Sequence, residues 1–395
     1  MKKAGLTAFI SGVAIALLVV GCASTAQPDD ESASQDILQS EPPPGRPSED
    51  GPPPGGPPEN RLPGGARPEE DMGEPIASTE IDTTGVLCDV NVSTVNDQLG
   101  LDSEVQWSCE DGKRRLVANG VPNHQTGEQF VGERNPIMAY EVDVSMPLNP
   151  VAREGAGQRI VVSAYGLNGV KFNPGTGGRC ASGVTDVSEC SLRPGSTGEW
   201  TMEALGQPIF DFGEDANHAH VQRGGQYHYH GVPLGMLSEE NLAGESMQLV
   251  GWAMDGFPLY ARYGYSDADA STSDLRVMKP SYQLKATPDP DRPSVEMMPM
   301  GTFSQDYEYI EGSGDLDECN GRFAVTPEFP QGVYHYYTTD VYPFVQRCVK
   351  GTPDPSNRSR GDDPDGDGRP AGRPDGAPPG GAPNGAPRPD GSPPS

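Results

Sequence analysis

Histidine residues gather in three short stretches of this chain. Two stretches, Asn217-His218-Ala219-His220 and Tyr227-His228-Tyr229-His230, each carry a His-x-His pair, and Val333-Tyr334-His335-Tyr336-Tyr337 carries a single histidine. Imidazole is the side chain most often used for metal ligation and for proton transfer near neutral pH. Because alternate side chains of an extended strand share a face, the two rings of each pair should point the same way. The chemistry therefore depends on whether the two pairs share one face.

The turn between the two pairs has two possible lengths. In an antiparallel hairpin, residues that lie opposite each other project from the same face. A two-residue Gly224-Gly225 turn would place His220 opposite Tyr229. The two His-x-His pairs would then lie on opposite faces, and no four-histidine site could form.

A three-residue loop predicts a different arrangement. The loop Arg223-Gly224-Gly225 would place His220 opposite His228 and His218 opposite His230. Such a loop needs a left-handed residue at its last position, which a glycine supplies at low cost. This loop length would bring four imidazoles to one face.

Four converging imidazoles would suit a transition metal, with copper or zinc as the principal candidates. We expect five histidines to bind the metal or line its site: His218, His220, His228, His230 and His335. Thioethers in Met297-Met298-Pro299-Met300 would favour Cu(I) slightly. The alternative is that each of these histidines is a hydrogen-bonded structural residue. We interpret the remaining histidine, His124, in this way, because it lies in a predicted turn.

Three acidic residues are candidates for outer-sphere contacts to the metal or for acid–base work: Asp255, Asp317 and Glu318. Each would equally serve as a turn residue that accepts backbone N–H groups. A second functional hypothesis is therefore a metal-dependent hydrolase or oxidase, or a metal-free enzyme that uses a histidine with Asp255 or Glu318. Against an enzyme, the sequence contains no Gly-x-Ser-x-Gly, His-Glu-x-x-His or P-loop motif. A third hypothesis is a structural or adhesive envelope module without metal.

The N-terminus has the pattern of an export signal. Lys2 and Lys3 precede an apolar run over residues 4–20, which is too short for a stable membrane span. The run ends in Leu18-Val19-Val20-Gly21-Cys22, which resembles the lipobox of bacterial lipoproteins, with Cys22 as the lipidated residue. Ala23 follows it, and by resemblance to the lipoprotein sorting rule this favours the outer membrane. We expect a signal peptide over residues 1–21 and a lipid-anchored protein of the cell envelope or cell surface.

The cysteine count agrees with export. Without Cys22 an even number of cysteines remains, and an even number in an exported chain indicates disulfides. Their order along the chain suggests three sequential pairs: Cys88 with Cys109, Cys180 with Cys190, and Cys319 with Cys348. A cysteine-ligated metal is disfavoured because no Cys-x-x-Cys spacing occurs.

Composition separates the chain into segments. Residues 22–84 and 352–395 are rich in Pro and Gly, and we expect a disordered tether and a disordered acidic tail. The chain has 57 Asp and Glu against 28 Lys and Arg, a formal charge of −29. This charge argues against nucleic acid and anionic lipid headgroups as partners.

The segment between them, residues 85–351, should form a single mostly-β domain. Two-residue periodicity predicts strands near residues 140–144, 159–165 and 248–253, and residues 236–248 are the best of few helix candidates. We expect a sandwich-like or barrel-like architecture with long loops.

An ordered set of motifs resembles the YHYH domain proteins over roughly residues 118–351. The segments that carry the resemblance are Pro122-Asn123-His124, Leu167–Phe172, Tyr227–Gly231, Ala253–Tyr260, Leu316–Arg322 and Thr326–Tyr336. The resemblance implies an exported or surface protein. It implies no catalytic residues, because the family name describes a motif and not a reaction.

Overall fold

The computed structural model describes Pro75 and residues 81–131, 136–155, 157–193, 196–222 and 224–359. The predicted signal peptide, Cys22, most of the predicted tether and all but the first residues of the predicted tail lie outside this part of the chain. Within it, short strands and connecting loops predominate, and the predicted mostly-β class is confirmed.

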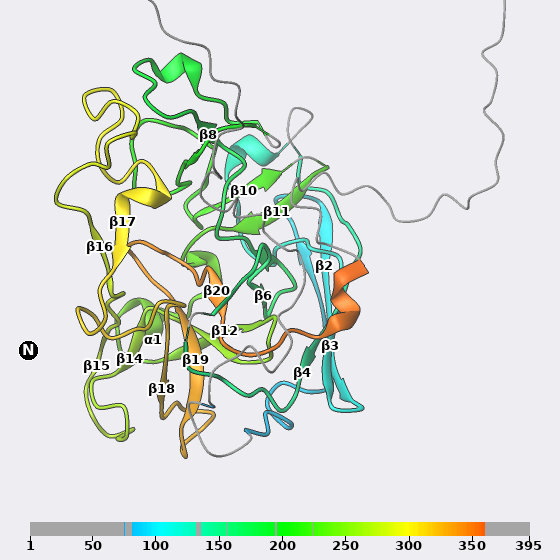
Figure 1. Ribbon diagram of the computed structural model, residues 1–395. Helices are drawn as coiled ribbons and strands as arrows, with labels where there is room; N and C mark the ends of the chain where they lie inside the picture. Colours follow the sequence, from blue (N-terminus) through cyan, green and yellow to red (C-terminus); the bar gives the residue numbers. More distant parts are fainter. Residues whose placement is uncertain are drawn as a thin grey trace, which may run out of the picture. The chain divides into compact units, whose positions relative to one another are not determined.

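The largest sheet has eight strands and carries the histidine motifs (Figure 1). Two neighbouring pairs are parallel, β11 with β7 and β13 with β19, and the other pairs are antiparallel. In spatial order its strands are β10 (Ala219–Gln222), β11 (Gln226–Tyr229), β7 (Lys171–Phe172), β6 (Ala164–Gly166), β12 (Gln248–Ala253), β13 (Pro258–Ala261), β19 (Val333–Thr338) and β18 (Gly321–Ala324).

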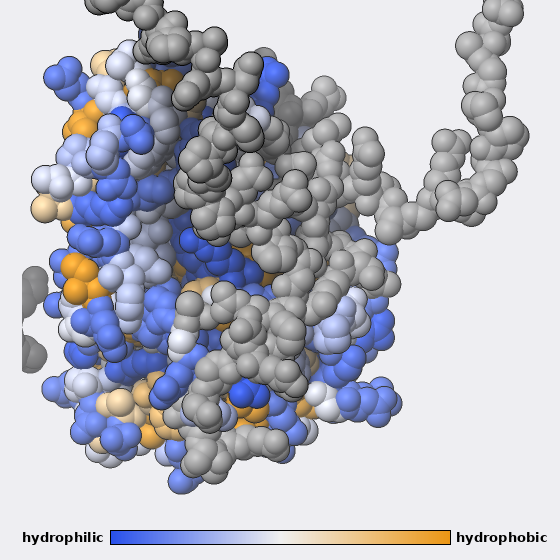
Figure 2. All heavy atoms as spheres, in the orientation of Figure 1, coloured by the Kyte–Doolittle hydropathy of each residue, from blue (hydrophilic) through white to orange (hydrophobic). Residues whose placement is uncertain are grey.

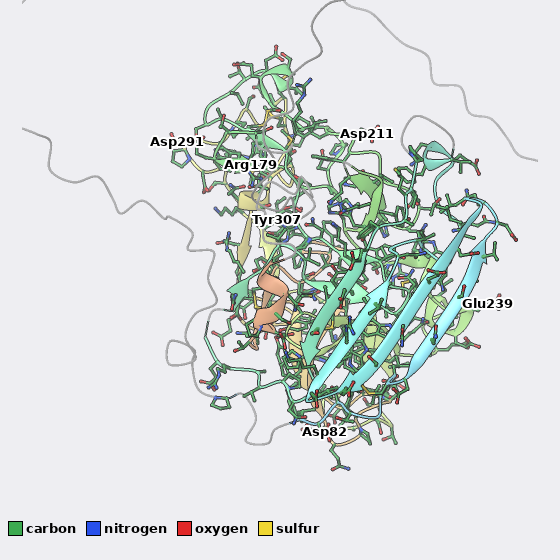
Figure 3. The ribbon with its side chains drawn as sticks, turned by 90° about the vertical axis from the view of Figure 1, so that its right-hand side faces the viewer. Asp82, Arg179, Asp211, Glu239, Asp291 and Tyr307 are labelled. Carbon is green, nitrogen blue, oxygen red and sulfur yellow. A yellow bond between two sulfur atoms is a disulfide. The ribbon has the colours of Figure 1, made fainter. Side chains whose placement is uncertain are left out.

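A second sheet is an antiparallel meander of four strands, seen face-on in Figure 3. Its strands in order are β1 (Val90–Asn96), β2 (Leu101–Glu110), β3 (Lys113–Ala118) and β4 (Val142–Pro147). Buried and less buried residues alternate along β3 and β4, as expected when one face of a sheet packs on the core.

The two sheets share a hydrophobic core. Trp107 and Leu116 of the four-stranded sheet belong to the same buried cluster as Trp252 and Tyr337 of the eight-stranded sheet. The guanidinium of Arg114 lies 3.6 Å from the ring centroid of Trp252, so it also joins the sheets. This arrangement is sandwich-like, and no closed barrel occurs among the described strands.

The other face of the eight-stranded sheet is covered as well. Tyr336, the neighbour of Tyr337 in β19, belongs to a second buried cluster with Phe172 and Leu259. All six residues of β19 are buried. A strand covered on both faces cannot show apolar–polar alternation, which is why this aromatic run differs from β3 and β4.

The remaining elements are short. Four two-stranded sheets pair β14 (Tyr263–Tyr265) with β15 (Leu275–Val277), β16 (Tyr282–Leu284) with β17 (Tyr307–Tyr309), β20 (Cys348–Val349) with β5 (Gln158–Arg159), and β8 (Arg179–Cys180) with β9 (Trp200–Thr201). The helical elements are α1 (Glu239–Leu242) and the 3-10 turns η2 (Glu128–Phe130), η3 (Val187–Glu189), η4 (Leu234–Met236), η5 (Ser304–Asp306) and η6 (Pro355–Ser359).

Two predicted elements differ from those observed. The strand expected over residues 159–165 is divided, because β5 pairs with β20 whereas β6 pairs with β12 and β7. The helix expected over residues 236–248 is reduced to the single turn α1, which Ser238 caps through its hydroxyl. The strand expected over residues 248–253 coincides with β12.

All three predicted disulfides are confirmed: Cys88–Cys109, Cys180–Cys190 and Cys319–Cys348. Cys180 is part of a third, separate hydrophobic cluster with Trp200 and Phe303. This cluster packs against β8 and β9, each of which is only two residues long.

The described surface is mainly hydrophilic on the face that Figure 2 shows, with scattered hydrophobic spots. Exposed large apolar residues such as Val92, Val95 and Val341 occur singly along the sequence. Within the part of the chain that the structure describes, no helix has both the length and the apolar character needed to cross a membrane.

Candidate metal centre

The β10–β11 hairpin has the register of the three-residue loop. Gln222 lies opposite Gln226 and His220 lies opposite His228. Gly225 adopts a φ of +81°, the left-handed conformation that this loop requires at its last position. The hairpin therefore places the rings of His220 and His228 on one face, as the longer of the two possible turns predicts.

His220, His228 and His230 form a compact cluster on this face. The Nε2 atom of His230 lies 3.0 Å from Nε2 of His228 and 3.2 Å from Nε2 of His220. Ligand atoms of all three residues lie within 4.8 Å of one another. His228 and His230 are buried, and His220 is nearly so. The cluster could hold a metal ion.

Hydrogen bonds at Nδ1 orient the rings of His220 and His228 and determine where their Nε2 lone pairs point. Nδ1 of His220 lies 2.8 Å from the carbonyl oxygen of Phe212, and Nδ1 of His228 lies 3.2 Å from that of Gln226. A carbonyl oxygen only accepts, so in the neutral rings both Nδ1 atoms carry the hydrogen. The Nε2 lone pairs of both rings consequently point toward His230. This is how metal-binding histidines are usually held.

Burial favours the neutral form of His228 and of His230. It lowers the pKa of His228 and of His230 well below the usual histidine value, and the neighbouring imidazoles lower both further. The ammonium of Lys171 acts in the same direction on both rings, and the guanidinium of Arg347 does so on His230. Metal ions bind the neutral imidazole, so these rings are in the binding form near neutral pH.

The spacing of the nitrogens also fits a metal. A tetrahedral ion with nitrogen donors at about 2.0–2.1 Å separates its donors by roughly 3.3–3.4 Å. The two Nε2 separations of His230, 3.0 and 3.2 Å, are only slightly shorter. Nδ1 of His230 is buried and has no hydrogen-bond partner among the described residues. A metal bound at Nε2 would leave this atom unpartnered, so His230 lacks the outer hydrogen bond that holds His220 and His228.

His218 does not join the cluster. Its backbone carbonyl accepts a hydrogen bond from the N–H of His230, so the two residues are neighbours in the hairpin as predicted. However, His218 has a φ of +53°, which breaks the alternation of side chains, and its Nδ1 bonds the carbonyl of Val232 at 2.9 Å. The four-imidazole face is therefore reduced to three imidazoles.

His335 also lies outside the cluster. It is fully buried in β19, where Nδ1 bonds the carbonyl of Val333 at 2.9 Å and Nε2 bonds the hydroxyl of Tyr337 at 2.7 Å. Both ring nitrogens are satisfied, and burial lowers the pKa of His335 to about 3. This histidine has the geometry of a structural core residue.

The tyrosines of β11 project from the face opposite the histidine cluster. Their contacts explain two other motifs, those around His124 and Asn168. The hydroxyl of Tyr229 lies 2.5 Å from Nε2 of His124, and it accepts a hydrogen bond from the side-chain amide of Asn168 at 2.9 Å. Tyr227 donates to the carboxylate of Asp215 at 2.6 Å. The tyrosines of Tyr-His-Tyr-His thus bind the hairpin to the segments around residues 124 and 168, while its histidines form the cluster.

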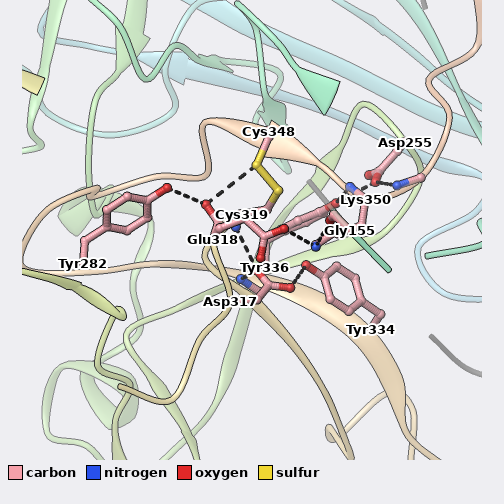
Figure 4. Close-up of a disulfide and its surroundings, with 12 residues drawn as sticks. Gly155, Asp255, Tyr282, Asp317, Glu318, Cys319, Tyr334, Tyr336, Cys348 and Lys350 are labelled. Atoms are coloured by element: carbon pink, nitrogen blue, oxygen red, sulfur yellow. Dashed lines mark hydrogen bonds and ion pairs between the residues drawn. A yellow bond between two sulfur atoms is a disulfide. The ribbon is translucent and has the colours of Figure 1, made fainter. Parts of the chain in front are cut away.

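The predicted acidic residues surround the Cys319–Cys348 disulfide instead (Figure 4). Asp255 accepts from the Tyr336 hydroxyl at 2.6 Å, and burial raises its pKa to about 6. Asp317 accepts from the Tyr334 hydroxyl at 2.7 Å, and Glu318 forms an ion pair with Lys350. These contacts hold β19 and the disulfide together and do not involve the three histidines.

Two charged neighbours of the cluster, Glu214 and Lys171, were not predicted from the sequence. One carboxylate oxygen of Glu214 lies 3.5 Å from His220 Nδ1 and has no hydrogen-bond partner among the described residues. Lys171 is the direct neighbour of His228 in the parallel β7–β11 pair. The position of Glu214 shortly before His218 was a usable signal, because metal-binding histidines often contact a carboxylate. The methionine run gives no support for copper, because Met298 packs in the third hydrophobic cluster near Cys190.

Comparisons with known proteins agree with the motif pattern. The family model described as YHYH protein matches residues 143–351, just over half of the chain. This span contains the hairpin, the three histidines and β19. A search of curated proteins and a search of solved structures gave no match.

Proposed function

The chain belongs to the YHYH protein family, and for this member we propose a transition-metal-binding function, with copper or zinc held by His220, His228 and His230. The observation that carries the proposal is the convergence of the three Nε2 atoms around His230. Imidazole nitrogen suits both metals, and the ring contacts do not distinguish them. The role of the protein would be to capture, store or deliver the metal.

The proposal includes the cell envelope as the place of binding. The lipobox-like Leu18–Cys22 run and the three disulfides of the folded part support an exported chain with a lipid on Cys22. Incorporation of labelled fatty acid into the full chain, with Cys22→Ser as the control, tests this part separately. Labelling of the Cys22→Ser chain to the same extent would contradict it.

Metal content and affinity of the full chain test the binding proposal. We expect about one copper or zinc ion per chain, measured by elemental analysis and by calorimetric titration. Single His220→Ala, His228→Ala and His230→Ala changes should each weaken binding by more than the roughly 10–100-fold that loss of an outer partner causes. His218→Asn is the matched control, because Asn tolerates the left-handed conformation of this position.

Two results would overturn metal binding. Either the chain binds none of these metals, or His218→Asn weakens binding as much as the three cluster variants do. The first result, with an unchanged fold, would support the structural or adhesive alternative.

A metal-dependent hydrolase or oxidase is the second candidate. It is favoured by one observation, that three histidines and not four converge. A tetrahedral ion held by three protein ligands keeps one position for water or substrate, as catalytic zinc sites do. Metal-dependent turnover that is lost in His228→Ala would support this candidate over storage.

A further inference from the structure

A buried ammonium group lies beside the three-histidine cluster. Lys171 in β7 and His228 in β11 are direct partners in a parallel strand pair, so both side chains project from the same face of the sheet. Lys171 is only 7 % exposed. The cluster therefore has a cation in its immediate surroundings.

This ammonium has no carboxylate partner among the described residues. Its Nζ donates to the side-chain oxygen of Gln226 at 2.8 Å, and that neutral amide also accepts from Gln222 at 2.7 Å. The other nearby cation, Arg347, is paired with Glu203 at 2.5 Å. Lys171 is thus the cation near the cluster whose charge is left unbalanced.

A bound metal would increase this imbalance. Three neutral imidazoles leave the charge of a divalent ion unchanged, and Glu214 is the carboxylate in contact with the cluster, at His220. Buried charges are costly unless they are paired. Three histidines also fill only three positions of a tetrahedral ion. The loaded site would therefore have both an open position and an unmatched positive charge.

We propose that the metal-loaded site binds a small carboxylate-type oxyanion. One oxygen of the anion would occupy the open position on the metal, and the Lys171 ammonium would donate a hydrogen bond to the anion. This inference rests on the proposed metal binding and names the class of ligand that the site selects. Neutral molecules of the same shape should bind much more weakly.

The test uses the full chain loaded with Cu(II) and titrated with acetate. Acetamide, which has a similar shape and no charge, serves as the control ligand. Copper electron paramagnetic resonance and visible absorption report directly on ligands of the metal. We expect a saturable spectral change with acetate and little change with acetamide.

Variants of Lys171 then separate its role from that of the metal. Lys171→Met should retain one copper per chain and bind acetate at least tenfold more weakly, because a charge-assisted hydrogen bond is lost. Lys171→Gln repeats the test with a side chain that can still bond Gln226. Lys171→Arg should keep acetate binding, and Lys279→Met, at an exposed lysine, should behave as the unmodified chain.

The possible failures are distinguishable. If the unmodified chain does not retain copper, the metal proposal itself is wrong. The anion inference is overturned if copper is retained but acetate leaves the spectra unchanged. It is likewise overturned if acetamide competes equally, or if Lys171→Gln and Lys171→Met both bind acetate with unchanged affinity.

Discussion

His124 and Tyr229 are joined by a 2.5 Å contact between Nε2 and the phenol oxygen, across two segments that are far apart in the sequence. The same hydroxyl accepts from Asn168 at 2.9 Å. Tyr229 is fully buried and precedes His230 in the chain. The contact therefore fixes the strand from which the metal-binding histidines project, from the opposite face.

Removal of this hydroxyl should affect stability and leave the metal stoichiometry unchanged. Tyr229→Phe deprives His124 and Asn168 of a partner, and we expect a loss of about 1–3 kcal/mol in the free energy of unfolding. Urea unfolding measures the loss. Tyr309→Phe is the control, because the hydroxyl of Tyr309 has no hydrogen-bond partner among the described residues. Equal stability of the two variants would contradict the structural role of the contact.

Two adjacent glycines should respond differently to alanine. Both Gly224 and Gly225 have positive φ, so each substitution costs about 1–2 kcal/mol for backbone strain. At Gly225 an added Cβ would lie 2.5 Å from the Met138 side chain, whereas at Gly224 it would meet open space. Gly225→Ala should therefore be the less stable variant and should also weaken metal binding, because the hairpin must shift. Calorimetric titration of both variants would disprove this reasoning if their metal affinities were equal.

Local patterns limited the hairpin to two possible registers, of which the structure has the one with the three-residue loop. The three-residue loop, the left-handed Gly225 and the opposition of His220 and His228 all depend on residues close together in the sequence, where turn geometry sets the register. The β12 strand was also predicted from a local pattern, the two-residue periodicity of residues 248–253. Three sequential disulfides also followed from the order of the cysteines along the chain.

The remaining features of the site depend on contacts between distant segments. Lys171 reaches His228 only because β7 and β11 pair in parallel, and no local pattern reports a parallel partner. His335 follows the same Tyr-His-Tyr pattern as His228, yet its ring bonds Tyr337 within a strand that is buried on both faces. The left-handed backbone at His218 is set by the surrounding chain and was not predictable from the His-x-His spacing.

The buried His335 should make stability depend on pH. Its pKa is about 3 in the folded protein and about 6.5 when unfolded, so between these values the unfolded chain binds more protons. Its contribution to stability is complete well above pH 6.5 and falls as the pH is lowered, by about 1.6 kcal/mol between pH 6.5 and pH 5. His335→Gln should lose less stability over this range in urea unfolding. Tyr337→Phe, which removes the same hydrogen bond but keeps the histidine, should retain the dependence of the unmodified chain.

Glu214 should strengthen metal binding without touching the metal. Its carboxylate lies 3.5 Å from His220 Nδ1, on the side of the ring away from the cluster. A negative charge at this position makes Nε2 a stronger donor, and loss of such an outer partner typically lowers metal affinity about 10–100-fold. Glu214→Gln should show a loss of this size in competition titrations, with one metal ion still bound per chain. The carbonyl of Phe212 remains to hold the ring, so the change isolates the effect of charge. Glu311→Gln, at an exposed site, should bind as the unmodified chain does, and equal affinities of the two variants would exclude a role for Glu214.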